Sequence, residues 1–122
     1  RVPHASEVLT GRYVEPPTFD GSDHRSHRRV EWMKQALQRL ELVKFLADED
    51  MDRTMGQAAI KFCLAQPTIT SVLPNFTNLE ELREYTAAPD ALDLTQEDLS
   101  RLEDLWRHGF NLEEPVPECR EI

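Results

Sequence analysis

The feature that most constrains the fold of this chain is one candidate β-strand set among several candidate helices. Residues 68–73 read TITSVL, a short, β-branched and apolar run that is typical of a buried strand. Because a single strand leaves its ladder hydrogen bonds unpaired, it must pair with a copy of itself or with strands outside these 122 residues. The chain also begins at Arg1 without a methionine, which suggests a fragment or a processed form. We therefore expect one piece of a larger fold.

Helical periodicity dominates the rest of the chain, where apolar residues recur at three- and four-residue steps. Thr54 and Gln57 have the spacing of a capping box at the start of one helix, and Thr95 suits the N-cap of the last. The apolar stripes include Trp32 and Trp106, which we expect to pack in the core. The predicted order is loop, two helices, strand, two helices and tail, over residues 1–25, 26–66, 68–73, 78–108 and 109–122.

Composition excludes several classes of protein. The net charge of −9 disfavours nucleic-acid binding, because phosphate backbones repel an acidic surface. Basic residues cluster only at Arg25, Arg28 and Arg29. No run approaches the ~20 apolar residues that span a bilayer, and no signal-peptide pattern is present. We expect a cytoplasmic protein that binds neither nucleic acid nor membrane.

The two cysteines have no spacing that links them or suggests a metal site. Cys63 lies in an apolar run, whereas Cys119 lies in the polar tail, so a reducing compartment is a simpler assumption than a disulfide. Residues 23–27 hold an aspartate and two histidines, but flanking arginines argue against a bound cation. A surface ion pair between Asp23 and Arg25 is favoured there, and we predict no metal site.

Four segments carry motifs in a recognisable order. Residues 1–13 read RVPHASEVLTGRY, residues 54–66 read TMGQAAIKFCLAQ, residues 68–85 read TITSVLPNFTNLEELREY, and residues 94–105 carry an L-x-x-E-x-L-x-x-L pattern. Together they resemble the aldo-keto reductases, (β/α)₈ barrels that reduce aldehydes and ketones with NADH or NADPH. The resemblance implies an α/β fold class: the C-terminal portion of a (β/α)₈ TIM barrel, mostly helical in this chain, with one or two short strands.

The resemblance also implies a cofactor site around the loop that residues 73–85 form. A strand that feeds a helix turns the amides of the helix N-terminus toward the ligand crevice, where they attract phosphate. By position, Arg12 matches a residue that reaches the pyrophosphate, Glu84 matches one that accepts from the adenine amino group, and Phe76 is placed to stack on adenine. The implied cofactor-binding residues are Pro3, His4, Ala5, Ser6, Arg12, Asn75, Phe76, Thr77, Glu81, Glu84 and Tyr85.

Several of these positions leave alternatives open. Glu81 stands where members that prefer NADP often carry arginine, and a carboxylate there would repel a 2′-phosphate and accept from ribose hydroxyls. Both NADP and NAD therefore remain candidate cofactors. His4 fits a contact with substrate or cofactor phosphate as well as an ordinary loop histidine. Asn75 replaces a Lys or Gly, and Tyr85 replaces a common Asn.

The family's catalytic set of Asp, Tyr, Lys and His has no matching motif in this chain, so we assign no catalytic residue and expect the chain alone to be inactive. The leading hypothesis is a cofactor-binding portion that meets a nicotinamide cofactor and a small carbonyl substrate in the complete barrel. It would associate with the missing barrel portion or form a homo-oligomer. The alternatives are a fragment without its own function and a non-catalytic helical interaction module with a partner surface around Met55, Ala59, Phe62 and Val72.

Overall fold

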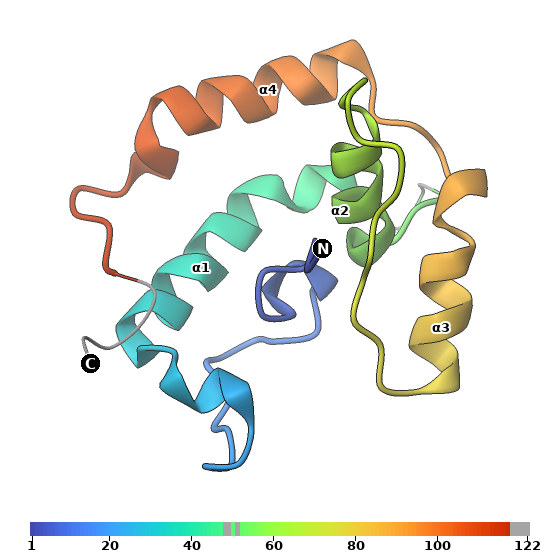
Figure 1. Ribbon diagram of the computed structural model, residues 1–122. Coiled ribbons are helices and arrows are strands. Elements are labelled where there is room, and N and C mark those ends of the chain that lie inside the picture. The colour runs from blue at the N-terminus through green and yellow to red at the C-terminus, as the bar shows by residue number, and fades with distance from the viewer. Residues whose placement is uncertain (48–49, 51, 118–122) are drawn as a thin grey trace.

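Helices account for the regular structure of the computed structural model, which describes residues 1–47, 50 and 52–117. The α-helices of this part are α1 (Val30–Val43), α2 (Met55–Leu64), α3 (Leu79–Thr86) and α4 (Gln96–Arg107). Short 3₁₀ turns join them, namely η1 (Val8–Thr10), η2 (His24–His27), η3 (Lys44–Leu46), η4 (Ala88–Asp90) and η5 (Gly109–Asn111). In Figure 1, α4 arches over α1 and α2, α3 lies beyond α2, and the N-terminal loop lies inside the arch.

The predicted helix starts are confirmed. Thr54 and Gln57 form a capping box at the start of α2, where the Gln57 amide donates to Thr54 Oγ1 at 3.1 Å and the Thr54 amide donates to Gln57 Oε1 at 3.0 Å. Thr95 caps α4 in the same way. The first of the two helices predicted within residues 26–66 begins later than expected, because α1 begins only at Val30, and its end tightens into η3.

The predicted strand at residues 68–73 is wrong for this structure, because the described residues contain no strand. The segment runs as an extended coil, and its one backbone link to the N-terminal loop is the hydrogen bond from the Val2 amide to the Leu73 carbonyl at 3.0 Å. Val2 has a φ of +56°, which turns the chain away after that single bond. A strand needs a neighbour for its ladder groups, and no neighbouring strand is present among the described residues to supply it.

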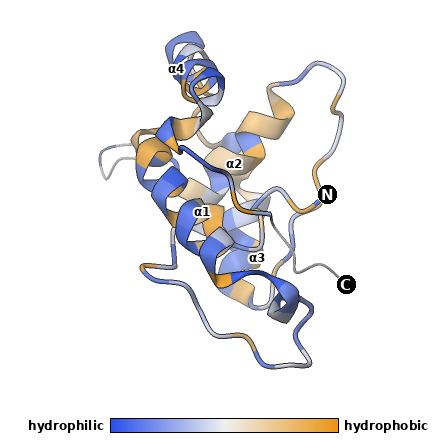
Figure 2. Cartoon of the chain, turned by 90° about the vertical axis from the view of Figure 1, so that its left-hand side faces the viewer, coloured by the Kyte–Doolittle hydropathy of each residue, from blue (hydrophilic) through white to orange (hydrophobic). Residues whose placement is uncertain are grey.

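The core lies between α1, α2 and η1. Its buried side chains are apolar: Val8, Met33, Ala36, Leu40, Val43, Leu46, Met55 and Ala58. A second, smaller cluster of Ile60, Tyr85 and Ala88 joins α2 to α3 and η4. Figure 2 shows mostly hydrophobic residues on α2 and hydrophilic residues along the solvent side of α1. Helix α2 is thus covered from two sides, as its broad apolar surface requires.

The two tryptophans differ from each other in their packing. Trp32 packs against the main cluster, as predicted. Trp106 is 75% exposed, so its predicted place in the core is wrong. The predicted tail does not leave the molecule at once: Gln35 of α1 donates to the Glu114 carbonyl at 2.7 Å and accepts from the Val116 amide at 2.9 Å. The rest of the tail, from residue 118 on, lies outside the described residues.

A buried arginine links the end of α1 to the segment before α4. Arg53 is 5% exposed and donates through Nε to the Leu46 carbonyl at 2.8 Å. Its Nη1 donates to the carbonyls of Leu92 and Asp93, each at 2.8 Å. A buried guanidinium is tolerated because these carbonyls, with Asp98 at 3.6 Å, replace its water.

Replacing Arg53 with methionine should lower the free energy of unfolding by about 2–4 kcal/mol, because three carbonyls lose their donor in a region that excludes water. Urea denaturation followed by circular dichroism measures the loss. The matched control is Arg107→Met, which removes an exposed arginine that pairs with Glu103. Equal urea midpoints for the two variants would contradict the structural role given to Arg53.

Candidate functional site

Three segments that are distant in sequence meet where the N-terminal loop crosses the first turns of α2 and α3. Arg12 of the loop forms ion pairs with Glu81 and with Glu84, both on α3. Its Nη2 lies 2.8 Å from Glu84 Oε2, and its Nη1 bonds Glu81 Oε1. The Arg12 side chain remains 40% exposed, so the pair of carboxylates holds it at the rim of the site without burying it.

Glu81 is fixed from two directions. Its Oε2 accepts from the Thr77 amide at 2.6 Å and from Thr77 Oγ1 at 3.1 Å, while Oε1 accepts from Arg12. Asn78 caps α3 by accepting from the Glu81 amide at 2.9 Å. Burial of this carboxylate favours its neutral form, but the Thr77 hydrogen bonds and the Arg12 charge outweigh burial and hold the pKa of Glu81 below its ordinary value. Glu81 is therefore ionised at neutral pH.

Glu84 connects α3 to the start of α2. Its Oε1 accepts from the Thr54 hydroxyl at 2.6 Å, and its backbone carbonyl accepts from Gln57 Nε2 at 2.9 Å. Sequence reasoning assigned Thr54 and Gln57 only to the capping box of α2. Their second role was missed, although a polar N-cap pair on the helix that precedes the predicted cofactor loop is the signal that could have indicated it.

His4 and Tyr85 form the floor of this cluster. Both are almost fully buried, their ring centroids lie 4.5 Å apart, and His4 Nε2 donates to the Gly56 carbonyl at 3.0 Å. Burial lowers the pKa of His4 below 6.5, and the hydrogen bond to Gly56 and the charge of Glu84 only partly oppose it. Burial likewise raises the pKa of Tyr85. A neutral His4 is thus packed into the site, an arrangement closer to an ordinary buried histidine than to an exposed phosphate ligand.

The close approach of α2 and α3 depends on the glycine at position 56. A Cβ atom there would lie 2.8 Å from Glu84 Oε1 and 2.9 Å from Tyr85 Cε1, distances that real side chains essentially never show. The missing side chain therefore lets the two helices meet and brings Glu84 within reach of Thr54 and Arg12.

The structure separates the remaining predicted cofactor residues from the cluster of Arg12, Thr77, Glu81, Glu84, His4 and Tyr85. Pro3 and Ala5 line an apolar groove instead. Ser6 is buried and accepts from Arg28 Nε at 2.9 Å. Asn75 and Phe76 are exposed in the loop ahead of α3.

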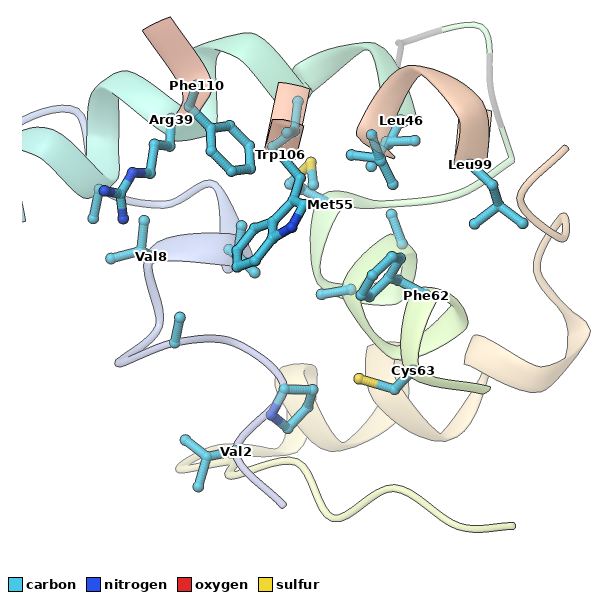
Figure 3. A pocket seen from close by; sticks show the side chains of 18 of the residues that line it. Val2, Val8, Arg39, Leu46, Met55, Phe62, Cys63, Leu99, Trp106 and Phe110 are labelled. Carbon is cyan, nitrogen blue, oxygen red and sulfur yellow. The ribbon is translucent and has the colours of Figure 1, made fainter. Parts of the chain in front are cut away.

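The apolar groove encloses about 850 Å³ between the N-terminal loop, α1, α2 and α4. Figure 3 shows Met55 and Phe62 of α2 and Leu99 and Trp106 of α4 around this hollow, with Val2 of the loop below them. Phe62 is 43% exposed. Large apolar side chains from the loop, α2 and α4 therefore line one open groove.

The other predicted surface features have simple outcomes. Asp23 pairs with Arg25 at 2.6 Å, and the same arginine reaches Glu7 at 2.5 Å, so the predicted ion pair is confirmed. Across the described ranges, no group of three or more His, Cys, Asp or Glu side chains is arranged to hold a metal. Cys63 is a free thiol, and Cys119 lies outside the described residues. None of the helices seen in residues 1–47 and 52–117 is long and apolar enough to cross a membrane.

Comparison with known proteins defines the family. The model of the aldo/keto reductase family matches residues 2–107, and the chain belongs to this family. No curated protein and no solved structure matches the chain. Membership implies a parent (β/α)₈ barrel and supports an oxidoreductase-like function, and the family generally uses NAD(P)H. A helical piece without strands in its described part is compatible with a fragment of that barrel.

Adding a single carbon at position 56 should disrupt this cluster. Gly56→Ala should lower the free energy of unfolding by about 1–3 kcal/mol, because the new methyl group overlaps the Tyr85 ring and the Glu84 carboxylate. Alanine favours a helix over glycine by up to about 1 kcal/mol, so a net loss in the free energy of unfolding must come from the steric overlap. Urea denaturation measures it against Gly21→Ala, where a Cβ meets nothing within 4 Å. A Gly56→Ala protein at least as stable as the parent would contradict the close helix contact.

Stability should also depend on the protonation of His4. Its pKa is lowered in the folded state, so the unfolded chain binds more protons, and the free energy of unfolding should fall as the pH drops below about 6.5. His4→Gln keeps a donor for the Gly56 carbonyl but cannot titrate, and should remove this slope. Urea midpoints between about pH 5.5 and 7.5 measure this slope. Glu81 has a lowered pKa, so the stability lost when it is protonated is lost only below this pH range. Equal slopes in the two proteins would contradict the buried, neutral His4.

Proposed function

We propose that this chain is the cofactor-binding C-terminal part of an NAD(P)-dependent aldo-keto reductase that reduces aldehydes or ketones. The observation that carries the proposal is the convergence of Arg12 with Glu81 and Glu84, three residues assigned to the cofactor from two separate segments of the sequence. In this proposal they bind the pyrophosphate and adenosine end of the cofactor. The cofactor itself supplies the hydride when it is bound.

The donor groups of the cluster suit a dinucleotide. An arginine has five N–H donors, and Arg12 uses one of them toward each of its two carboxylate partners, so its half-exposed guanidinium can still donate to a pyrophosphate oxygen. Glu84 presents a carboxylate that can accept from an adenine amino group, and its side chain, which is 17% exposed, faces the loop that carries Arg12. The cluster thus combines two carboxylates that can accept from hydroxyl and amino groups, Glu81 and Glu84, with one cation that can bind phosphate, Arg12.

The apolar groove supports a role as one part of a barrel. In a (β/α)₈ barrel the helices cover the strands with their apolar faces. The described residues contain helices but no strand, and Phe62, Leu99 and Trp106 line an open groove. We propose that the remaining portion of the barrel packs here and contributes the catalytic residues and the carbonyl-binding pocket. No residue of this chain is assigned a catalytic role.

The exposure of Trp106 and Phe62 also favours a second candidate, the non-catalytic interaction module. Of the four residues predicted for its partner surface, Met55 and Ala59 are buried, Val72 is partly buried, and only Phe62 is exposed. The surface would therefore centre on the groove. Sedimentation of the 122-residue chain separates the two candidates. A stable compact oligomer supports the module, whereas an aggregating or loosely packed species supports an incomplete barrel.

Supplying the N-terminal barrel portion in trans should produce binding of NADH or NADPH, detected by cofactor fluorescence. Arg12→Gln should then weaken binding by roughly tenfold, because one charge-assisted hydrogen bond to phosphate is lost. Arg107→Gln, which removes an exposed arginine of α4, should leave the affinity unchanged. An assembled protein that binds neither cofactor would overturn the proposed function.

A further inference from the structure

We propose that the apolar groove between α1, α2 and α4 binds an amphipathic carboxylate with one unbranched hydrocarbon tail, and that Arg39 receives its carboxylate. The inference goes beyond the proposed function, because the groove shares none of its lining residues with the ion-paired cluster of Arg12, Glu81 and Glu84. The proposed function places the remaining portion of the barrel in the same groove, so that portion and the ligand exclude each other.

The walls of the groove suit a hydrocarbon tail. The groove encloses about 850 Å³, within the range of roughly 300–1,000 Å³ that is usual for small-molecule pockets. Its walls include apolar side chains of two helices, Met55 and Phe62 of α2 and Leu99 and Trp106 of α4 (Figure 3). Phe62 and Trp106 are 43% and 75% exposed, so a tail that covers them removes apolar surface from water.

Arg39 of α1 brings a cation to one end of this groove. Its Nε is buried without a hydrogen-bond partner, and its guanidinium forms no hydrogen bond or ion pair with any residue that the structure describes. The guanidinium carbon lies 5.9 Å from the centre of the Phe110 ring, which also lines the groove, so the cation is held against an aromatic face. Figure 3 shows Arg39 beside Phe110, with Trp106 between Arg39 and Phe62.

A carboxylate is the head group that this arginine fits best. A buried donor without an acceptor is unfavourable, and a carboxylate supplies two oxygens in the geometry of a guanidinium edge. The other charges of the groove do not oppose an anion: Arg1 is a second cation, and Glu103 is already paired with Arg107. In a chain of net charge −9, the described lining residues thus carry more positive than negative charge.

The position of the cation at one end of an apolar hollow requires head and tail in one molecule. A small hydrophilic anion would gain the guanidinium but would lose its water among apolar walls. A neutral hydrocarbon would cover the walls but would leave Arg39 without an acceptor. An unbranched carboxylate satisfies both, because its head meets Arg39 while its tail runs along Trp106 toward Phe62.

The test follows the intrinsic fluorescence of the 122-residue chain, since Trp32 and Trp106 both line the groove. The probes are decanoate, decanol and decyltrimethylammonium, which share one tail and differ in the charge of the head, each below its micelle-forming concentration. Decanoate should bind with saturation and at least roughly tenfold more tightly than decanol, because it adds a charge-assisted contact. Decyltrimethylammonium should bind no more tightly than decanol.

The variant Arg39→Gln separates the contribution of the head from that of the tail. Its affinity for decanoate should fall roughly tenfold, while decanol should bind as it does to the parent protein and so show that the groove is intact. Lys34→Gln is the matched control, because it removes an exposed positive charge from the same helix at a position outside the lining of the groove. It should retain the preference for decanoate.

The parent protein alone decides whether the groove selects a carboxylate. Decanol that binds as tightly as decanoate, or uptake of all three probes without saturation, overturns the inference. A preference for decanoate that Arg39→Gln does not reduce, while decanol binds as before, overturns the role of Arg39. Cofactor binding is measured on the assembled protein, so each of these results leaves the proposed function standing.

Discussion

The contact between α2 and α3 at Gly56 is the constraint on which the rest of the site depends. Because no side chain projects from this position, Tyr85 and Glu84 approach the backbone of α2 directly, and the Gly56 carbonyl receives the His4 imidazole. The first turn of α2, the second half of α3 and a loop more than 50 residues away from α2 along the chain then share one small volume. Arg12 completes it by joining both carboxylates of α3. One missing methyl group thus sets the geometry of the whole cluster.

The apolar groove beside α2 has a different origin. The described residues contain no sheet that could cover the apolar side chains of this groove. In a (β/α)₈ barrel, each helix packs its apolar face against the strands. Here α4 arches over that space, and Trp106 stays largely exposed in it. The single hydrogen bond between Val2 and Leu73 joins two segments that resemble the ends of neighbouring barrel strands. The ion-paired cluster of Arg12, Glu81 and Glu84 shares none of these residues with the lining of the groove.

Local sequence patterns predicted the features that depend on neighbouring residues. The capping boxes at Thr54 and Thr95 involve groups three residues apart, so the sequence determines them. The strand at residues 68–73 failed because a ladder needs a partner that the described chain lacks. The family resemblance brought Arg12, Glu81 and Glu84 to one site, but not the hydroxyl of Thr54 on Glu84, which depends on how closely α2 and α3 pack. Long-range contacts of this kind follow from tertiary packing alone.

We propose that the loop of Arg12 and the first turn of α3 form one nucleotide-binding surface. Nuclear magnetic resonance of the isotope-labelled chain during titration with ADP-ribose, the cofactor without its nicotinamide, tests it most directly. The signals of the Thr77 amide and of the Arg12 side chain should shift, and the indole signal of Trp106 should stay unchanged. Shifts confined to the groove around Trp106, or none at Arg12 and Thr77 at saturating ADP-ribose, would contradict it.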